Sequence, residues 1–289
     1  MKTGLILEGG AMRGLFTAGI IDVMMERGID FDGVIGVSAG AAFGCNFKSR
    51  QPGRVIRYNK RFCRDPRYCG WRSLIKTGDL FGGEFCYHEL PDRLDLFDRA
   101  AYDANPLPFY AVCTDVATGE PVVHRCDDAE ESLEWLRASA SMPLVSRIVT
   151  IDGRGYLDGG ISDSVPLRTF EGMGYEKNVV VLTQPADYVK KPNRMMPLFR
   201  WRLKAYPRVV AALADRHWAY NQTLAYVRRR EAAGAAFVIR PKAALPIGHM
   251  CHDAERLEAV YQIGRETAEA CLPALKSFMA GQRADVLGK

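Results

Sequence analysis

The chain has 289 residues, of which 48% are hydrophobic, and a formal net charge of +5. This composition excludes a disordered chain and allows a sizeable core, so we expect one domain, or one domain with an extension. No stretch approaches the about 18 apolar residues of a membrane span, and the first residues reach a charge too early for a signal peptide, so we expect a cytoplasmic protein.

The first 48 residues alternate between strand and helix patterns. Residues 5–7 predict a short buried strand, and the apolar spacing over 15–25 predicts a helix that stops near Gly28. Residues 31–37 predict the next strand, and the Ala- and Gly-rich segment 39–47 predicts a helix packed closely on a sheet. This order implies parallel strands joined by helical crossovers.

The rest of the chain continues this alternation without an internal repeat or a low-complexity linker. Further strands are expected at 108–114, 121–125, 147–151, 178–183 and 236–240, and helices at 129–138, 207–233 and 253–280. Two segments without clear periodicity, 48–106 and 184–206, are expected to be irregular inserts. The fold class is therefore α/β, a three-layer sandwich with a mainly parallel central sheet.

The basic residues are concentrated in two segments. Residues 48–76 hold ten Lys or Arg against one acid, Asp65, and residues 188–208 hold seven Lys or Arg and no acid. The two segments carry +9 and +7, which leaves −11 for the remaining chain. This asymmetry indicates localised contact with an anionic partner, and solvated helix faces are the alternative.

The cysteines show no spacing typical of zinc or redox sites. Because no C-x-x-C pair occurs, we expect thiols that act as small apolar residues. The eight positions are Cys45, Cys63, Cys69, Cys86, Cys113, Cys126, Cys251 and Cys271.

The pentapeptide Gly-Val-Ser-Ala-Gly, residues 36–40, lies between a predicted strand and a predicted helix. Alone it is a weak signal, because the chain holds 27 glycines. Its setting is that of a nucleophile elbow, in which Gly36 and Gly40 let the strand and the helix approach while Ser38 is held on the turn. Ser38 comes too early in the chain for an ordinary α/β hydrolase.

A second glycine cluster, Gly-Gly-Ala-Met-Arg-Gly at 9–14, also joins a strand to a helix. Its backbone N–H groups could bind an anion or a developing oxyanion, and two adjacent parallel strands would place it beside Ser38. A tight turn and a dinucleotide fingerprint are the alternatives. The dinucleotide fingerprint needs a glycine at residue 11, which is Ala here. It also needs an acidic residue at the end of the second strand to bind the ribose, and this chain has Val37-Ser38 there.

Asp158 precedes Gly159-Gly160 in the segment 156–166 and could project from a strand end, although Asp-Gly is also a common turn signal. No histidine adjoins such a turn among His88, His124, His217, His249 and His252. His249 and His252 could complete a Ser, Asp, His order, and their spacing also suits a metal pair, but no third ligand cluster lies nearby.

Four motifs in this order resemble the patatin-like phospholipase family: Gly-Gly-Ala-Met-Arg-Gly (9–14), Gly-Val-Ser-Ala-Gly (36–40), Arg-Ala-Ser-Ala-Ser-Met-Pro (137–143) and Asp-Gly-Gly (158–160). The resemblance covers residues 4–170, with the basic insert 48–106 inside it. The part from 171 to 289 is expected to complete the same α/β domain with long helices.

The resemblance implies serine acyl hydrolysis of lipid esters such as phospholipids or lysophospholipids. It makes Ser38 the nucleophile and Asp158 its sole side-chain partner, with no metal or organic cofactor. It places the oxyanion hole at Gly9, Gly10 and Ala11, completed by Gly14 and by Arg13 as an anchor of the loop.

Two residues depart from the family pattern. Ala11 stands where a third glycine is common, and we expect it to donate its N–H at a negative φ. Ser164 stands where an Asn is often found after the Asp-Gly-Gly turn.

The basic segments, which are interleaved with aromatic residues, favour peripheral contact with an anionic membrane on its inner face. Nucleic acid is not expected, since no recognition motif accompanies them. The alternative to an enzyme is a catalytically silent protein of the same fold that binds such a membrane or another partner.

Overall fold

Short runs of buried apolar residues form the centre of an eight-stranded sheet. The computed structural model describes residues 1–281. Its strands are β1 (Lys2–Leu7), β2 (Gly33–Val37), β3 (Phe109–Asp115), β4 (Pro121–Arg125), β5 (Val149–Ile151), β6 (Arg154–Asp158), β7 (Tyr175–Val181) and β8 (Ala236–Ile239).

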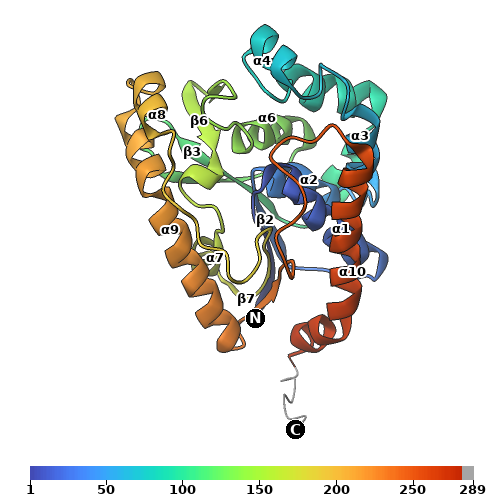
Figure 1. Cartoon of the computed structure of the whole chain (residues 1–289). Coiled ribbons are helices and arrows are strands. Elements are labelled where there is room, and N and C mark those ends of the chain that lie inside the picture. Colours follow the sequence, from blue (N-terminus) through green and yellow to red (C-terminus); the bar gives the residue numbers. More distant parts are fainter. Residues whose placement is uncertain (282–289) are drawn as a thin grey trace.

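Helices connect these strands (Figure 1). They are α1 (Gly14–Glu26), α2 (Ala39–Lys48), α3 (Arg54–Phe62), α4 (Trp71–Thr77), α5 (Arg99–Ala104), α6 (Ala129–Ser139), α7 (Leu167–Gly172), α8 (Met196–Arg202), α9 (Pro207–Ala232) and α10 (Ala254–Met279). Two 3₁₀ turns, η1 (Ala11–Arg13) and η3 (Gly159–Ile161), and a π-helix, η2 (Phe85–Leu94), complete the elements.

The strands lie in the order β5-β6-β3-β2-β1-β7-β8, and β4 pairs with β3. The central strands β3, β2, β1, β7 and β8 run parallel, while β4, β5 and β6 add antiparallel pairs at one side. The carboxyl ends of β1 and β2 therefore lie next to each other. The predicted fold class, a mainly parallel α/β sheet, is confirmed.

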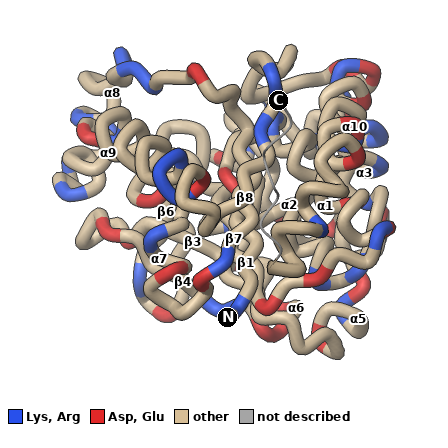
Figure 2. Tube along the Cα trace, turned by 90° about the horizontal axis from the view of Figure 1, so that it is seen from below, with Lys and Arg blue, Asp and Glu red and all other residues tan. Residues whose placement is uncertain are grey.

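The sheet is covered on both faces because its strands are apolar on both faces. On β1, Leu5 and Leu7 join the core on the side of α1 and α2, whereas Ile6 joins the core on the side of α7 and α9. Figure 2 shows the strands edge-on between α9 and α7 on one side and α1, α2 and α10 on the other. Two hydrophobic cores thus hold three layers together.

The segment 48–106 was expected to be irregular but contains four helices, so that expectation was wrong, whereas 184–206 is irregular apart from one short helix. Residues 48–106 contain α3, α4, η2 and α5, and residues 184–206 contain α8. In α3 the buried residues Val55, Tyr58 and Phe62 alternate with arginines and lysines at helical spacing. The high density of charge hid this periodicity in the sequence. Strand β6 was anticipated only as the strand end at Asp158, and helix α7 was not predicted.

All eight cysteines are free thiols, as expected from their spacing. Five of them are buried and the other three are half-buried, which agrees with a packing role. No helix within residues 1–281 is both long enough and apolar enough to cross a bilayer.

Candidate active site

Ser38 lies between the end of β2 at Val37 and the start of α2 at Ala39. Its backbone has φ 55° and ψ −124°, a region that non-glycine residues rarely occupy and that costs of order 1–3 kcal/mol. Gly40 permits this sharp turn, because a Cβ there would lie 2.3 Å from the carbonyl oxygen of Leu7 on β1. The local structure is the strand-turn-helix that the sequence predicted.

The side chain of Ser38 meets the side chain of Asp158, which is 120 residues away in the sequence. The Ser38 hydroxyl donates a hydrogen bond of 2.7 Å to Asp158 Oδ2. Asp158 is the last residue of β6, and β6 is brought there by antiparallel pairing with β3, the neighbour of β2. Ser38 is 9% exposed and Asp158 3% exposed, and both residues line a small recess.

The other polar groups around Asp158 fix its carboxylate in place. Gly160 N–H donates to Asp158 Oδ1 at 2.7 Å, and the Asp158 N–H donates to the carbonyl of Ser141 at 2.8 Å. Burial raises the pKa of Asp158, while the Ser38 hydroxyl, the positive charge of Arg216 and the Gly160 N–H oppose that rise. Asp158 is therefore a stronger base than an exposed carboxylate.

Ser139 supports the turn at Ser38, a role that the sequence analysis did not assign. The Ser38 N–H donates to Ser139 Oγ at 2.9 Å, and Ser139 Oγ donates to the carbonyl of Val112 on β3 at 2.6 Å. The residue belongs to the motif at 137–143, which was noted only for the resemblance. The position of Ser139 in that motif was the one sequence feature that could have indicated this role.

The glycine-rich loop at 9–14 lies against Ser38. A Cβ on Gly9 would lie 2.8 Å from Ser38 Cβ, so only glycine lets the loop approach this closely. Within residues 1–281 the backbone N–H groups of Gly10 and Ala11 donate to no protein acceptor. Free N–H groups beside a serine are what an oxyanion requires, and the oxyanion hole stays a prediction.

Ala11 does not have the negative φ that the sequence analysis expected, because its φ is 49°. The chain turns there from the end of β1 into η1 and α1, and this turn needs a left-handed residue. Glycine would take this conformation with less strain, so the departure from the family pattern at Ala11 carries a conformational cost. Gly14 begins α1, where a Cβ would lie 2.9 Å from Ala39 Cβ.

Arg13 does not anchor the loop through its side chain. Its guanidinium forms no hydrogen bond or ion pair within residues 1–281, and its Nε is buried without a partner. The side chain instead lines the cavity beside Ser38. Ser164, at the other departure from the family pattern, donates to the carbonyl of Gly160 at 2.8 Å and so stabilises the Asp-Gly-Gly turn.

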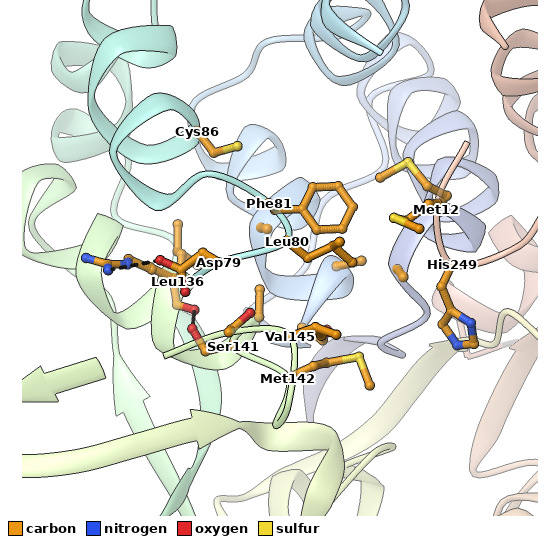
Figure 3. A pocket seen from close by; sticks show the side chains of 18 of the residues that line it. Met12, Asp79, Leu80, Phe81, Cys86, Leu136, Ser141, Met142, Val145 and His249 are labelled. Atoms are coloured by element: carbon orange, nitrogen blue, oxygen red, sulfur yellow. Dashed lines mark hydrogen bonds and ion pairs between the residues drawn. The ribbon is translucent and has the colours of Figure 1, made fainter. Parts of the chain in front are cut away.

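A cavity of about 650 Å³ extends from Ser38. It is bounded by η2, by helix α8 and by the loop that follows α6. Figure 3 shows Met12, Phe81, Leu80, Val145 and Met142 gathered around it, with His249 at one side. Most of its lining is apolar, although Arg13, Lys190 and Arg216 line it too, and its size is within the range of small-molecule sites, so the apolar part suits a hydrocarbon chain.

The two histidines considered for a triad have different surroundings. His249 lines the cavity, and burial lowers its pKa, whereas the Nδ1 of His252 lies 2.5 Å from the carbonyl oxygen of Cys63. Within residues 1–281 no hydrogen bond joins a histidine to Ser38 or Asp158. In the same range no group of three His, Cys, Asp or Glu residues could hold a metal ion.

Comparison with known proteins agrees with this arrangement of motifs. Residues 5–170 match the family described as Patatin-like phospholipase. The chain belongs to the patatin-like phospholipase family. The resemblance drawn from the four motifs over 4–170 is thereby confirmed. Residues 206–280 of this patatin-like protein match a second family, described as a domain of unknown function (DUF6363).

Similar proteins occur in bacteria and fungi. The uncharacterized protein YjjU of Escherichia coli is 29% identical over 69% of this chain and 57% of its own length. An uncharacterized NTE family protein of Mycobacterium bovis is 26% identical over 62% of this chain and 48% of its own. The chain thus spans about half the length of these curated relatives.

More distant similarities include an enzyme and a solved structure. A protein of Cryptococcus neoformans named Lysophospholipase NTE1 is 27% identical over 65% of this chain and 12% of its own. The crystal structure of VipD from Legionella pneumophila matches with a TM-score of 0.45 and 13% identity, over 94% of this chain and 67% of that one.

Proposed function

We propose that this patatin-like protein is a serine acyl hydrolase that cleaves carboxylic esters of lipids through Ser38 and Asp158. The observation that carries the proposal is the 2.7 Å hydrogen bond from the Ser38 hydroxyl to Asp158, at one end of an apolar cavity of about 650 Å³. Family membership and a relative named as a lysophospholipase support lipid hydrolysis in general.

In the proposed reaction Ser38 Oγ attacks the ester carbonyl while Asp158 Oδ2 takes its proton. The N–H groups of Gly10 and Ala11 stabilise the oxyanion, and the C–O bond breaks as the alcohol leaves with the proton from Asp158. Asp158 then takes a proton from water, which attacks the acyl-enzyme; the bond from the acyl carbon to Ser38 Oγ breaks, Asp158 returns the proton to Ser38 Oγ, and the fatty acid is released. The apolar cavity would hold the acyl chain through both steps.

A fluorophosphonate probe tests the nucleophile. We expect it to label Ser38, located by peptide mass analysis, and Ser38→Ala to lose both labelling and esterase activity. Ser146→Ala is the matched control, because it removes another serine hydroxyl from the wall of the same cavity. Labelling that persists in Ser38→Ala would overturn the assignment. A folded wild-type protein with no labelling and no ester hydrolysis would favour the catalytically silent alternative.

The two basic segments proposed to contact a membrane differ in how many of their cations are paired with acids of the protein. In residues 48–76 five cations form ion pairs: Arg50 with Asp30, Arg54 and Arg57 with Asp95, Lys60 with Glu258, and Arg67 with Asp65 and Glu89. Lys48, Arg61 and Arg64 donate to backbone carbonyls. Most of the first segment therefore serves the fold, and only Arg72 and Lys76 on α4 lack such a partner within residues 1–281.

The segment around α8 is instead exposed and unpaired. Arg200, Arg202 and Lys204 are exposed and form no ion pair within residues 1–281. Trp201 beside them is 71% exposed, and Trp71 on α4 is 66% exposed. Figure 1 places α4 and α8 at the end of the molecule opposite the N-terminus, the end at which the parallel strands terminate beside Ser38. We therefore propose that α4 and α8 make the peripheral contact with an anionic membrane.

A further inference from the structure

A polar recess of about 70 Å³, lined in part by Ser38, Asp158 and Glu8, adjoins the larger cavity. Three cationic side chains line it, and two of them come from outside the residues that match the patatin-like family: Lys190 from the loop after β7 and Arg216 from α9. The third is Arg13. The recess thus holds three cations against two carboxylates, Glu8 and Asp158, and the same three cations also line the adjoining end of the larger cavity.

The backbone of Lys190 is held in place by the side chain of Asn221 on α9. The Lys190 N–H donates to Asn221 Oδ1 at 2.9 Å, and Asn221 Nδ2 donates to the Lys190 carbonyl at 3.0 Å. The ammonium lies 4.4 Å from the centre of the Tyr220 ring, which orients it further. These contacts with α9 position the Lys190 ammonium at the recess in the unliganded protein.

The ammonium of Lys190 has no anionic partner within residues 1–281. The buried acid Glu8 acts on the charge of Lys190 without forming an ion pair with it, and accepts hydrogen bonds from the backbone N–H and hydroxyl of Thr183 and from the hydroxyl of Tyr220. Arg13 Nε is likewise buried without a partner. Partly buried cations that form no ion pair are costly unless an anion joins them.

From this geometry we infer that Lys190, together with Arg13 and Arg216, binds a phosphate group of the substrate and selects phosphate-bearing acyl esters over neutral acylglycerols. The inference rests on the proposed function, because the phosphate lies beside the ester that Ser38 attacks. The acyl chain then occupies the apolar cavity, and the head group lies in the recess.

The charge on Lys190 depends on pH. Burial, assisted by Arg216 and Arg13, lowers the pKa of Lys190 to about 8, while Glu8 opposes that change. The preference for phosphate-bearing esters should therefore weaken as pH rises through about 8. The other titratable groups that line the recess are Asp158, Tyr220 and His249, and Tyr188 and Lys191 line the adjoining cavity.

The test compares lysophosphatidate with a monoacylglycerol of the same acyl chain, both in micelles of an uncharged detergent. We expect Lys190→Met to lower kcat/KM for lysophosphatidate by about tenfold or more and to leave the monoacylglycerol within twofold, since one charge-assisted contact is lost. Lys190→Arg, which keeps the charge, should retain the preference and should not lose it near pH 8.

Equal effects of Lys190→Met on both esters, or no effect on either, would overturn the inference while the proposed function stands. If Lys190→Met fails to fold, the wild-type ratio of the two rates between pH 7 and pH 9 decides instead, and a constant ratio contradicts the role of Lys190. Absence of Ser38-dependent hydrolysis of both esters would overturn the proposed function and this inference with it.

Discussion

In the proposed reaction Asp158 acts as a base although it is buried, and its surroundings set how strong a base it is. Burial raises its pKa, and Arg216 is the charged group that opposes the rise. Arg216 Nε also donates to the carbonyl of Gly160, next to the N–H that holds Asp158 Oδ1. Arg216 is therefore a positioning residue supplied by α9, outside the region of the four motifs.

We expect Asp158→Asn to lower kcat for a small soluble ester by on the order of a thousandfold, because an amide cannot accept the Ser38 proton. In the wild type, activity should fall as pH falls through the raised pKa of Asp158, above the ordinary value of 3.8.

Arg216→Met removes a positive charge that lowers the pKa of Asp158, so the fall in activity at acid pH should move to higher pH. Arg216→Lys, which keeps the charge, should restore the wild-type profile. Identical limbs in the pH profiles of wild type and Arg216→Met would contradict the role of Arg216.

At the scale of elements, the consecutive helices α8 and α9 differ in what their side chains contact. Phe199 and Leu203 fix α8 to the core, which leaves its arginines and Trp201 exposed. Helix α9 packs Leu224 and Val227 on the sheet and sends Arg216 to the active site. Figure 1 shows α9 running from α8 towards the end of the molecule where the N-terminus lies.

Neutralising Arg200 and Arg202 to Gln should weaken binding to anionic vesicles by up to about 30-fold at low salt, at about 1 kcal/mol for each charge. Hydrolysis of a soluble ester should not change. Arg228→Gln with Arg229→Gln is the matched control, because these exposed charges lie at the opposite end of α9. Vesicle sedimentation measures the effect, and equal losses in both double variants would exclude a specific membrane face.

At the scale of the whole molecule, α10 closes one side of the sheet by packing on α1 through a buried carboxyl group. Tyr261 donates its hydroxyl to Asp22 Oδ2 at 2.7 Å, and Gly53 N–H donates to the same oxygen at 2.8 Å. The other oxygen of Asp22 is buried without a partner. Burial raises the pKa of Asp22 to about 6.

The folded protein thus keeps a proton on Asp22 up to about pH 6, whereas an unfolded chain releases it near 3.8. Asp22 should therefore lower the free energy of unfolding by up to about 3 kcal/mol as pH rises between these values. An amide at this position cannot titrate, so the stability of Asp22→Asn relative to wild type should increase from pH 4 to pH 7. Urea denaturation at both pH values measures this, and parallel pH dependence in the two proteins would refute it.

The sequence alone determined what depends on local pattern. Apolar runs placed the central strands, and the glycine-flanked Ser38 was identified as a turn between a strand and a helix. The four motifs were sufficient to predict the family and the mainly parallel sheet. Local steric rules act within a few residues, so they can be read without knowing the partners. The same rules failed where charge was dense, as in α3, or where Ala11 had to take a positive φ.

Only the tertiary structure decided which distant residues meet. The pairing of β2 with β3 and of β3 with β6 brings Asp158 to Ser38, and no local pattern encodes that register. The position of Lys190 against Tyr220 and Asn221, and the contact of Arg216 with Gly160, depend on how α9 packs across the sheet. Whether a basic residue supports the fold or faces a ligand depends on the acids near it in space, so charge counts along the chain could not separate the paired residues 48–67 from the unpaired cations of α8.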